Sequence, residues 1–351
     1  MESFEEIKRH HDAFWANSHI DRCCLYIRKL YTEDLPPQSL EQQWLDIPFR
    51  CRQDRFRTER TEFFADAYPC TFINLGPCSL SEAIGRPFAL SDRTVWFELE
   101  PFLADLSEGG KSLTLNKEST LFRLAEEYIL QTVRTNGYVP SIPDLGGVTD
   151  VLCTLRGTQD LLADLYDDPE GFMAYTSRLQ VLWVEAFRHF TELLMKESGL
   201  MTSWLPVLSD VPFSPIQCDF CGMISPDMFR EFILPELKYL SEHTPRSIYH
   251  LDGVDEIKHL DAILSLPGIN AIQWIAGAGK ANTGDPQWFD LYRRIQAAGK
   301  GLVLLDVDPN LAEGLFRELS HDGLFLRINC EDEAQANELI RAATGLAHSA
   351  K

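Results

Sequence analysis

The sequence has no apolar run of the roughly 18 residues that a membrane-spanning helix requires. Its start, Met1 to Lys8, lacks the basic region and the apolar stretch of a secretory signal peptide. Basic residues are also few, because 32 Lys and Arg stand against 53 Asp and Glu, for a formal net charge of -21. A field of this sign repels nucleic acid and anionic membranes. We therefore expect a cytoplasmic protein that has neither nucleic acid nor a membrane as a partner.

The motifs of nucleotide binding are missing as well. There is no Gly-x-Gly-x-x-Gly turn and no Gly-Lys-Ser/Thr phosphate loop, so nucleotide cofactors have no support, and no repeat of solenoid period is present. The nine cysteines of this long chain, which has no export signal, argue for reduced thiols. A length of 351 residues fits one large domain, such as a barrel of about 250 residues that carries an extension.

The order of apolar segments predicts an α/β protein. Residues 1–65 read as helices and connectors broken at Pro36-Pro37, which predicts a helical N-terminal extension. Over residues 66–351, short apolar runs alternate with amphipathic stretches, the pattern of parallel strands and crossover helices. Eight such runs predict a (β/α)8 TIM barrel, with strands at Cys70–Leu75, Val95–Leu99, Val139–Pro143, Pro215–Asp219, Ser247–Leu251, Ile269–Ile275, Gly301–Asp306 and Leu324–Cys330.

One helix has a well-defined start. Ser225 can cap the segment from Ser225 to Ser241, and Pro226 occupies its first helical position. Four apolar residues repeat at helical spacing and predict a buried stripe, namely Phe229, Phe232, Ile233 and Leu237.

In a barrel the catalytic groups lie at the carboxyl ends of the strands. His250 and Asp252 stand two residues apart on a predicted strand and therefore face the same side, and Cys330 ends the last strand. Three protein ligands with a fourth position open form a catalytic zinc site. From spacing alone, the commoner outcome is a hydrogen-bonded histidine, a turn aspartate before Gly253 and a small core cysteine.

Other strand ends add candidates for catalysis and substrate binding. Asp144 and Asp219 are candidate acids or bases, together with His250, although each aspartate could equally cap a helix or form an ion pair. Asp306, Cys218 and Trp274 are candidate substrate contacts, but Trp274 could equally pack in the core. Cys218 and Cys221 have the spacing of a redox or zinc pair, a weak signal without a second pair.

Several of these segments resemble the uroporphyrinogen decarboxylase superfamily. The segment Ile224–Pro235 is similar to the family's helix of general form S-P-E-M-F-R-E-F-V-L-P. Pro143–Leu165, Tyr249–Gly253 and Ile272–Trp274 extend the likeness, which covers roughly residues 137–345. The resemblance implies a TIM barrel.

The likeness favours one of the family's two branches. The decarboxylases carry an arginine-rich N-terminal segment that holds the carboxylates of a tetrapyrrole, and Ile20–Cys24 does not resemble it. Acidic strand ends in a chain of charge -21 also predict the wrong field for a polyanion. The other branch comprises corrinoid-linked methyltransferases that bind zinc through His-x-Cys and a distant Cys. His250, Asp252 and Cys330 fall on that pattern, with Asp252 in place of the usual cysteine.

The resemblance implies a zinc-dependent methyltransferase that moves a methyl group between a small-molecule substrate and a corrinoid, a methylcobamide carried on a partner protein. Zn2+ would act as a Lewis acid, and a ligand set with fewer thiolates leans toward an oxygen-bearing substrate such as a methoxy compound. Two alternatives stay open on the same barrel: a decarboxylase or lyase of a small carboxylic acid, and a non-catalytic ligand-binding protein.

Overall fold

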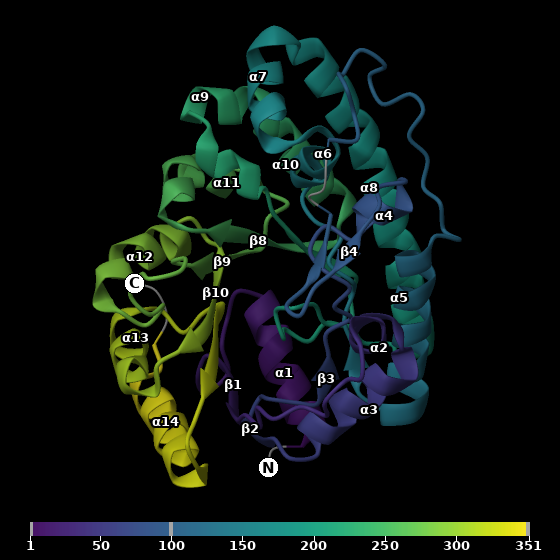
Figure 1. The fold of residues 1–351 in the computed structure, drawn as a ribbon. Coiled ribbons are helices and arrows are strands. Elements are labelled where there is room, and N and C mark those ends of the chain that lie inside the picture. Colours follow the sequence, from purple (N-terminus) through teal and green to yellow (C-terminus); the bar gives the residue numbers. More distant parts are fainter. Residues whose placement is uncertain (1–2, 98–100, 349–351) are drawn as a thin grey trace.

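The computed structural model describes residues 3–97 and 101–348 and shows an α/β protein built on a mostly parallel central sheet (Figure 1). The strand order is β2-β1-β11-β10-β9-β8-β7, and only β2 runs antiparallel to its neighbour. The strands are β1 (Cys24–Lys29), β2 (Glu62–Ala65), β7 (Phe213–Ile216), β8 (Arg246–Asp252), β9 (Ala271–Ile275), β10 (Gly301–Val307) and β11 (Leu324–Asn329).

Two strand pairs lie outside this sheet. β3 (Cys70–Thr71) and β6 (Val139–Pro140) are parallel, whereas β4 (Ala89–Leu90) and β5 (Val95–Trp96) form an antiparallel pair. Within the described residues, no ladder joins β1 to β3 or β6 to β7. The structure therefore shows an α/β protein with a mostly parallel sheet and does not establish a closed barrel.

Each of the eight predicted strands overlaps an observed strand, with boundaries shifted by a few residues. The predicted strand Val95–Leu99, of which residues 98 and 99 lie outside the described residues, does not join the central sheet. Its first part forms β5 in a hairpin, because Ser91 makes a turn in which its side-chain hydroxyl accepts the backbone N–H of Thr94 at 3.0 Å. That turn directs β5 back along β4 rather than into the central sheet.

The N-terminal segment corrects the expectation of a purely helical extension. Residues 1–65 contain helices, but they also contain β1 and β2, and β1 lies between β2 and β11 inside the sheet. Four successive residues of β1, from Cys24 to Ile27, are buried. A strand that is buried on both faces has a short, continuous apolar sequence without alternation. Periodicity alone cannot distinguish such a sequence from that of a buried helix, which is why β1 was not predicted.

Helices surround the sheet. They are α1 (Phe4–Trp15), α2 (Leu40–Leu45), α3 (Ile47–Thr58), α4 (Leu80–Ala83), α5 (Thr120–Gln131), α6 (Val148–Arg156), α7 (Thr158–Asp167), α8 (Pro169–Glu197), α9 (Pro226–Met228), α10 (Leu234–His243), α11 (Leu260–Leu264), α12 (Phe289–Ala297), α13 (Ala312–Glu318) and α14 (Glu333–Leu346). In the described part of the chain, none of them combines the length and the apolar character that crossing a membrane requires.

The helix predicted after Ser225 is confirmed, with one irregularity. The Ser225 hydroxyl caps its start by accepting the backbone N–H of Met228 at 3.2 Å. A π-helical turn, Phe229–Ile233, joins α9 to α10. Pro235 follows this turn and cannot donate a backbone hydrogen bond, which accounts for the wider turn. The predicted stripe is buried, and its members are Phe229, Phe232, Ile233 and Leu237.

Helix α1 covers the amino end of the central sheet. The Phe14 ring lies 5.9 Å from that of Phe325, near the start of β11, and the Trp15 ring lies 5.1 Å from that of Phe213, the first residue of β7. The Trp15 indole N–H also donates to the Leu208 carbonyl at 2.9 Å. Because α1 covers the amino edge, a functional site is expected at the opposite edge, where the parallel strands have their carboxyl ends.

Candidate metal centre

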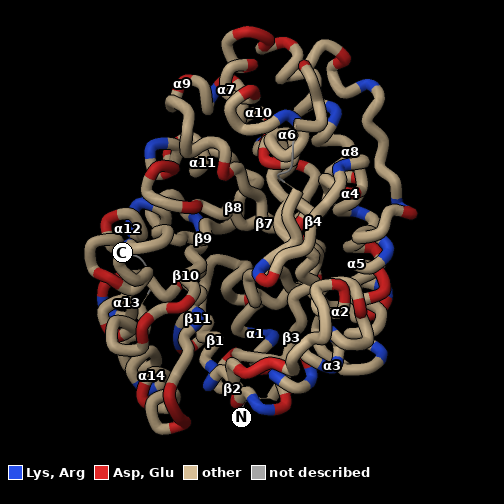
Figure 2. Tube along the Cα trace, in the orientation of Figure 1, with Lys and Arg blue, Asp and Glu red and all other residues tan. Residues whose placement is uncertain are grey.

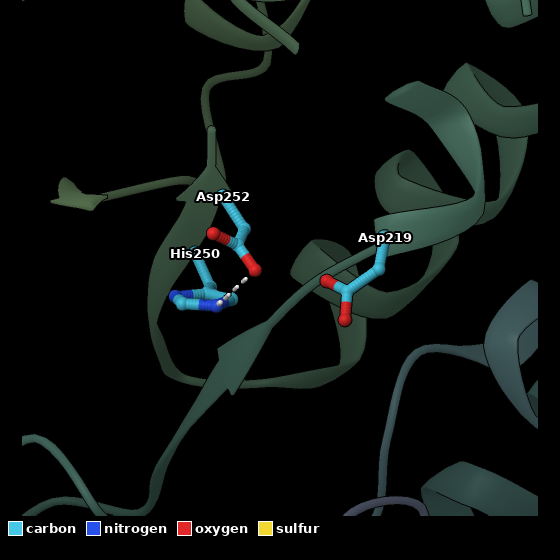
Figure 3. Close-up of side chains that lie close together, drawn as sticks. All are labelled: Asp219, His250 and Asp252. Carbon is cyan, nitrogen blue, oxygen red and sulfur yellow. Dashed lines mark ion pairs between the residues drawn. The ribbon is translucent and has the colours of Figure 1, made fainter. Parts of the chain in front are cut away.

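Three side chains with metal-binding atoms meet at the carboxyl edge of the sheet. His250 and Asp252 come from β8, and Asp219 comes from the turn that follows β7 (Figure 3). One ligand atom from each residue lies within 4.8 Å of the others, and His250 Nε2 is 4.0 Å from Asp252 Oδ2. The two-residue spacing on one strand brings His250 and Asp252 to the same side. Asp219 joins them because β7 and β8 are parallel neighbours.

Gln273 fixes the orientation of the His250 ring. It lies directly beside His250 on the neighbouring strand β9, and its side-chain carbonyl oxygen contacts His250 Nδ1. A carbonyl oxygen can only accept, so Nδ1 carries the proton in this arrangement, and the Nε2 lone pair faces the carboxylates. Metal-binding histidines are commonly held in this way. Trp204 also packs against His250: the two ring centroids are 6.1 Å apart and the ring planes are nearly perpendicular.

Asp150, at the start of α6, holds the turn that carries Asp219. Its carboxylate accepts the backbone N–H of Asp219 at 3.0 Å and that of Phe220 at 2.9 Å. Burial, the nearby Asp219 charge and other acids raise the pKa of Asp150 well above its usual range. This contact could not be predicted from the sequence, because Asp150 and Asp219 are 69 residues apart.

Two of the carboxyl groups at this edge, those of Asp219 and Asp144, have raised pKa values. Desolvation raises the pKa of Asp219, although its side chain is partly open to solvent. The His250 charge lowers this pKa and the Asp252 charge raises it further. Desolvation also raises the pKa of Asp144 to about 6. The hydrogen bond that its carboxylate accepts from the Gly146 N–H at 2.9 Å lowers this pKa but does not cancel the rise. Bringing several carboxylates together carries a repulsive energy that a bound cation would relieve.

Cys330 lies outside this group. β10 and β9 separate its strand from β8, and the charges nearest to its thiol are those of Asp332, Glu62 and Lys29. Burial raises the pKa of the Cys330 thiol, which disfavours the thiolate that zinc would require. In this geometry the third candidate ligand is therefore Asp219 rather than Cys330.

The three residues expected to contact substrate are outside the group of possible metal ligands. Trp274 is fully buried and packs against Trp288 on the face of β9 opposite Gln273, so it is a core residue. Cys218 is fully buried beside Cys221, and burial raises its thiol pKa well above the usual range. Asp306 is exposed, and its carboxylate accepts a hydrogen bond from the Arg327 guanidinium at 2.6 Å. Burial argues against substrate contacts for Trp274 and Cys218, whereas the role of the exposed Asp306 stays a prediction.

Comparison with known proteins gives a fold likeness and no family. No family model matches the chain, and no curated protein matches it. Among solved structures, the fold is similar to that of a methyltransferase from Methanosarcina mazei, with a TM-score of 0.61 and 12% sequence identity. The similarity covers 97% of this chain and 98% of the other. The chain therefore shares a methyltransferase-like fold over nearly its full length.

Proposed function

We propose that this protein is a zinc-dependent methyltransferase that moves a methyl group between a small substrate and a corrinoid carried on a partner protein, and that its strands form the eight-stranded barrel of the uroporphyrinogen decarboxylase superfamily. The observation that carries the proposal is the convergence of Asp219, His250 and Asp252 at the carboxyl edge of the sheet. The full-length likeness to a methyltransferase fold supports it. One imidazole and two carboxylates are a donor set that zinc accepts.

Each residue of the centre has a distinct task in this proposal. His250, Asp252 and Asp219 would hold the ion, which supplies Lewis acidity when bound. Gln273 keeps the Nδ1 proton of His250 in place, and Asp150 keeps the Asp219 turn rigid. Asp144, whose pKa is raised to about 6, can hold or release a proton near neutral pH beside the substrate.

A second candidate function is decarboxylation or another lyase reaction on a small carboxylic acid. The perturbed pKa of Asp144 favours it, because general acid–base catalysis works best with a pKa close to the working pH. Here Asp144 or Asp219 would move the proton and His250 would assist. Product analysis separates the two functions, since methyl transfer leaves the carbon skeleton whole and decarboxylation releases CO2.

Metal analysis of protein purified without chelator tests the centre. We expect one zinc per chain in the wild-type protein. Asp252→Asn should lose most of the metal, since it removes a charged ligand, while Asp255→Asn should keep it. Asp255 is the matched control because it is an exposed acid three residues further along that lies outside the ligand group. Equal metal content in both variants would refute the site.

A further pair of variants identifies the third ligand. The geometry predicts that Asp219→Asn loses metal and that Cys330→Ser keeps it, because among the described residues Asp219 groups with His250 and Asp252 and Cys330 does not. The reverse result would favour the ligand set implied by the family resemblance and would mean that the strand ends move together on metal binding. Circular dichroism of each variant confirms that the fold is retained.

A further inference from the structure

A cavity of about 500 Å³ with a strongly basic lining lies at the same edge of the sheet. Among the described residues that line it are four arginines, Arg28, Arg50, Arg57 and Arg327, but only one acid, Asp54. The excess of positive charge is unexpected in a chain of net charge -21. Figure 2 shows acidic and basic residues over the outer helices and loops, with basic residues also at β1 and β11. The lining of the cavity is thus more basic than the net charge of the chain suggests.

Two of the arginines have no carboxylate partner among the described residues. Arg28 Nε donates to the neutral side chain of Asn329 at 3.0 Å, and Arg50 donates to the Trp44 carbonyl at 3.3 Å. Arg50 is also largely buried and lies over the Tyr128 ring, 4.6 Å from its centroid. The acid whose charge interacts with Arg50 is Asp54, and burial raises the pKa of Asp54 to about 6. The Arg50 charge is therefore only weakly compensated, so an anion supplied from outside would be bound favourably.

The other two arginines are only partly satisfied. Arg57 pairs with Asp34 at the exposed rim. Arg327 pairs with Asp306 through one terminal nitrogen, but its buried Nε atom has no hydrogen-bond partner in the described chain. An unpartnered buried N–H is rare in proteins and marks a place where a ligand oxygen or water completes the structure. This atom is a second observation that points to a ligand.

The register of the sheet places the cavity on the same face as the metal centre. In the register of the sheet, His250 on β8 pairs with Gln273 on β9, Gln273 pairs with Val303 on β10, and Val303 pairs with Phe325 on β11. Residues level with one another in parallel strands point to the same face, and so do residues two apart in one strand. Arg327 therefore shares the face of His250, as does Arg28, which lies two residues beyond Tyr26, the partner of Arg327.

Trp204 connects the two sites directly. Its ring contacts His250 edge-on, and the same residue lines the cavity together with Phe63 and Phe72. The lining of the cavity therefore combines aromatic rings with guanidinium groups. A volume of about 500 Å³ falls within the range of roughly 300–1,000 Å³ that is usual for small-molecule sites.

We propose that this cavity binds an aromatic carboxylate, with the carboxylate on Arg28 and Arg327, the ring beside Trp204 and Phe72, and the far end of the molecule directed toward His250. Planar guanidinium groups suit a carboxylate because they can form two parallel hydrogen bonds with it. The assignment of this molecule as the methyl-bearing substrate rests on the proposed function. The binding of the anion does not rest on it, since it depends on the arginines alone.

Calorimetric titration of the full chain tests the proposal with 4-methoxybenzoate and its neutral analogue 4-methoxybenzamide, which has nearly the same shape. We expect the carboxylate to bind at least about tenfold more tightly than the amide, the smaller end of what hydrogen bonds to a charged group contribute. Arg28→Gln should abolish most of this preference, and Arg28→Lys, which keeps the charge, should retain part of it. Arg341→Gln is the matched control, because Arg341 is exposed on α14 and does not line the cavity.

The outcomes separate this inference from the proposed function. Equal affinity for the two compounds, no binding of 4-methoxybenzoate, or equal effects of Arg28→Gln and Arg341→Gln would overturn the anion site. The titration is repeated on Asp252→Asn and on protein treated with a chelator. A carboxylate preference that persists there, in a protein that never holds zinc or transfers methyl groups, would refute the methyltransferase proposal and leave the anion site in place.

Discussion

At the scale of single residues, the buried acid Glu256 gives the structure a distinct pH dependence. Its side chain is 1% exposed, and burial followed by the nearby Cys221 and Asp219 raises its pKa to about 11. In the unfolded chain this carboxyl has a pKa of about 4.3. The folded protein therefore keeps the proton at neutral pH, where the unfolded chain releases it, so the contribution of Glu256 to stability falls as pH rises from about 4.3.

We expect Glu256→Gln to stabilise the protein at neutral and alkaline pH, because glutamine stays neutral in both states and can still accept the hydrogen bond from the Tyr249 hydroxyl. The advantage in the free energy of unfolding should grow between pH 6 and pH 9, by at most about 1.4 kcal/mol per pH unit. Urea unfolding at several pH values measures it. A constant difference across this range would show that Glu256 is ionised in the folded state.

The residue scale also shows what the sequence can and cannot predict about the site. The proximity of His250 and Asp252 follows from strand geometry alone and was predictable. Asp219 was a candidate catalytic residue, but its place as a possible ligand depends on how β7 lies beside β8. The basic cavity was not predictable, because its arginines come from β1, α3 and β11, which only the fold brings together. Net charge therefore did not predict the basic lining of this cavity.

At the scale of elements, the start of α6 and the turn after β7 fit too closely to admit a larger residue at Gly147. A Cβ atom there would lie 2.3 Å from the Gln217 carbonyl oxygen and 2.4 Å from Asp150 Oδ2. We expect Gly147→Ala to lower the free energy of unfolding by about 1–3 kcal/mol, as overpacking does. It should also weaken metal binding, because Asp150 holds the Asp219 turn.

Gly345→Ala is the matched control for this effect. Gly345 lies in α14, where an added Cβ meets no atom within 4 Å, so alanine should leave stability unchanged or raise it by up to about 1 kcal/mol. Urea unfolding and zinc titration of both variants provide the comparison. A Gly147→Ala protein with wild-type stability and zinc affinity would show that α6 can shift without disturbing Asp219.

Strand prediction was also limited at this scale, and β1 shows why. Its buried core of about four residues lacks the polar and apolar alternation that marks a half-buried strand. Charged residues flank it on both sides, at Asp21-Arg22 and at Arg28-Lys29, and helical segments precede and follow it. The strands of the central sheet that were predicted, β7 to β11, are separated by clear helical stretches in the sequence.

At the scale of the whole molecule, the place of β1 makes residues 1–65 part of the central domain. β1 pairs with β11 along five residues, and the Cys330 backbone N–H donates to the Arg28 carbonyl at 2.9 Å beyond that ladder. Asp66 accepts the backbone N–H of Leu25 at 2.7 Å, and α1 packs its aromatic residues under the sheet. Removing this segment would expose the buried edge of β11 and a large apolar surface.

We therefore expect a fragment of residues 66–351 not to fold on its own, although the sequence suggested that it would contain the whole barrel. Exposed strand edges and apolar surface favour aggregation, so the fragment should be insoluble or lack a cooperative thermal transition by circular dichroism. Co-expression with residues 1–65 should restore soluble protein, because the contacts between the two pieces are the ones that the intact chain makes. A fragment that unfolds cooperatively and binds zinc as tightly as the full chain would show that β1 is an accessory strand, and that the sheet is complete without it.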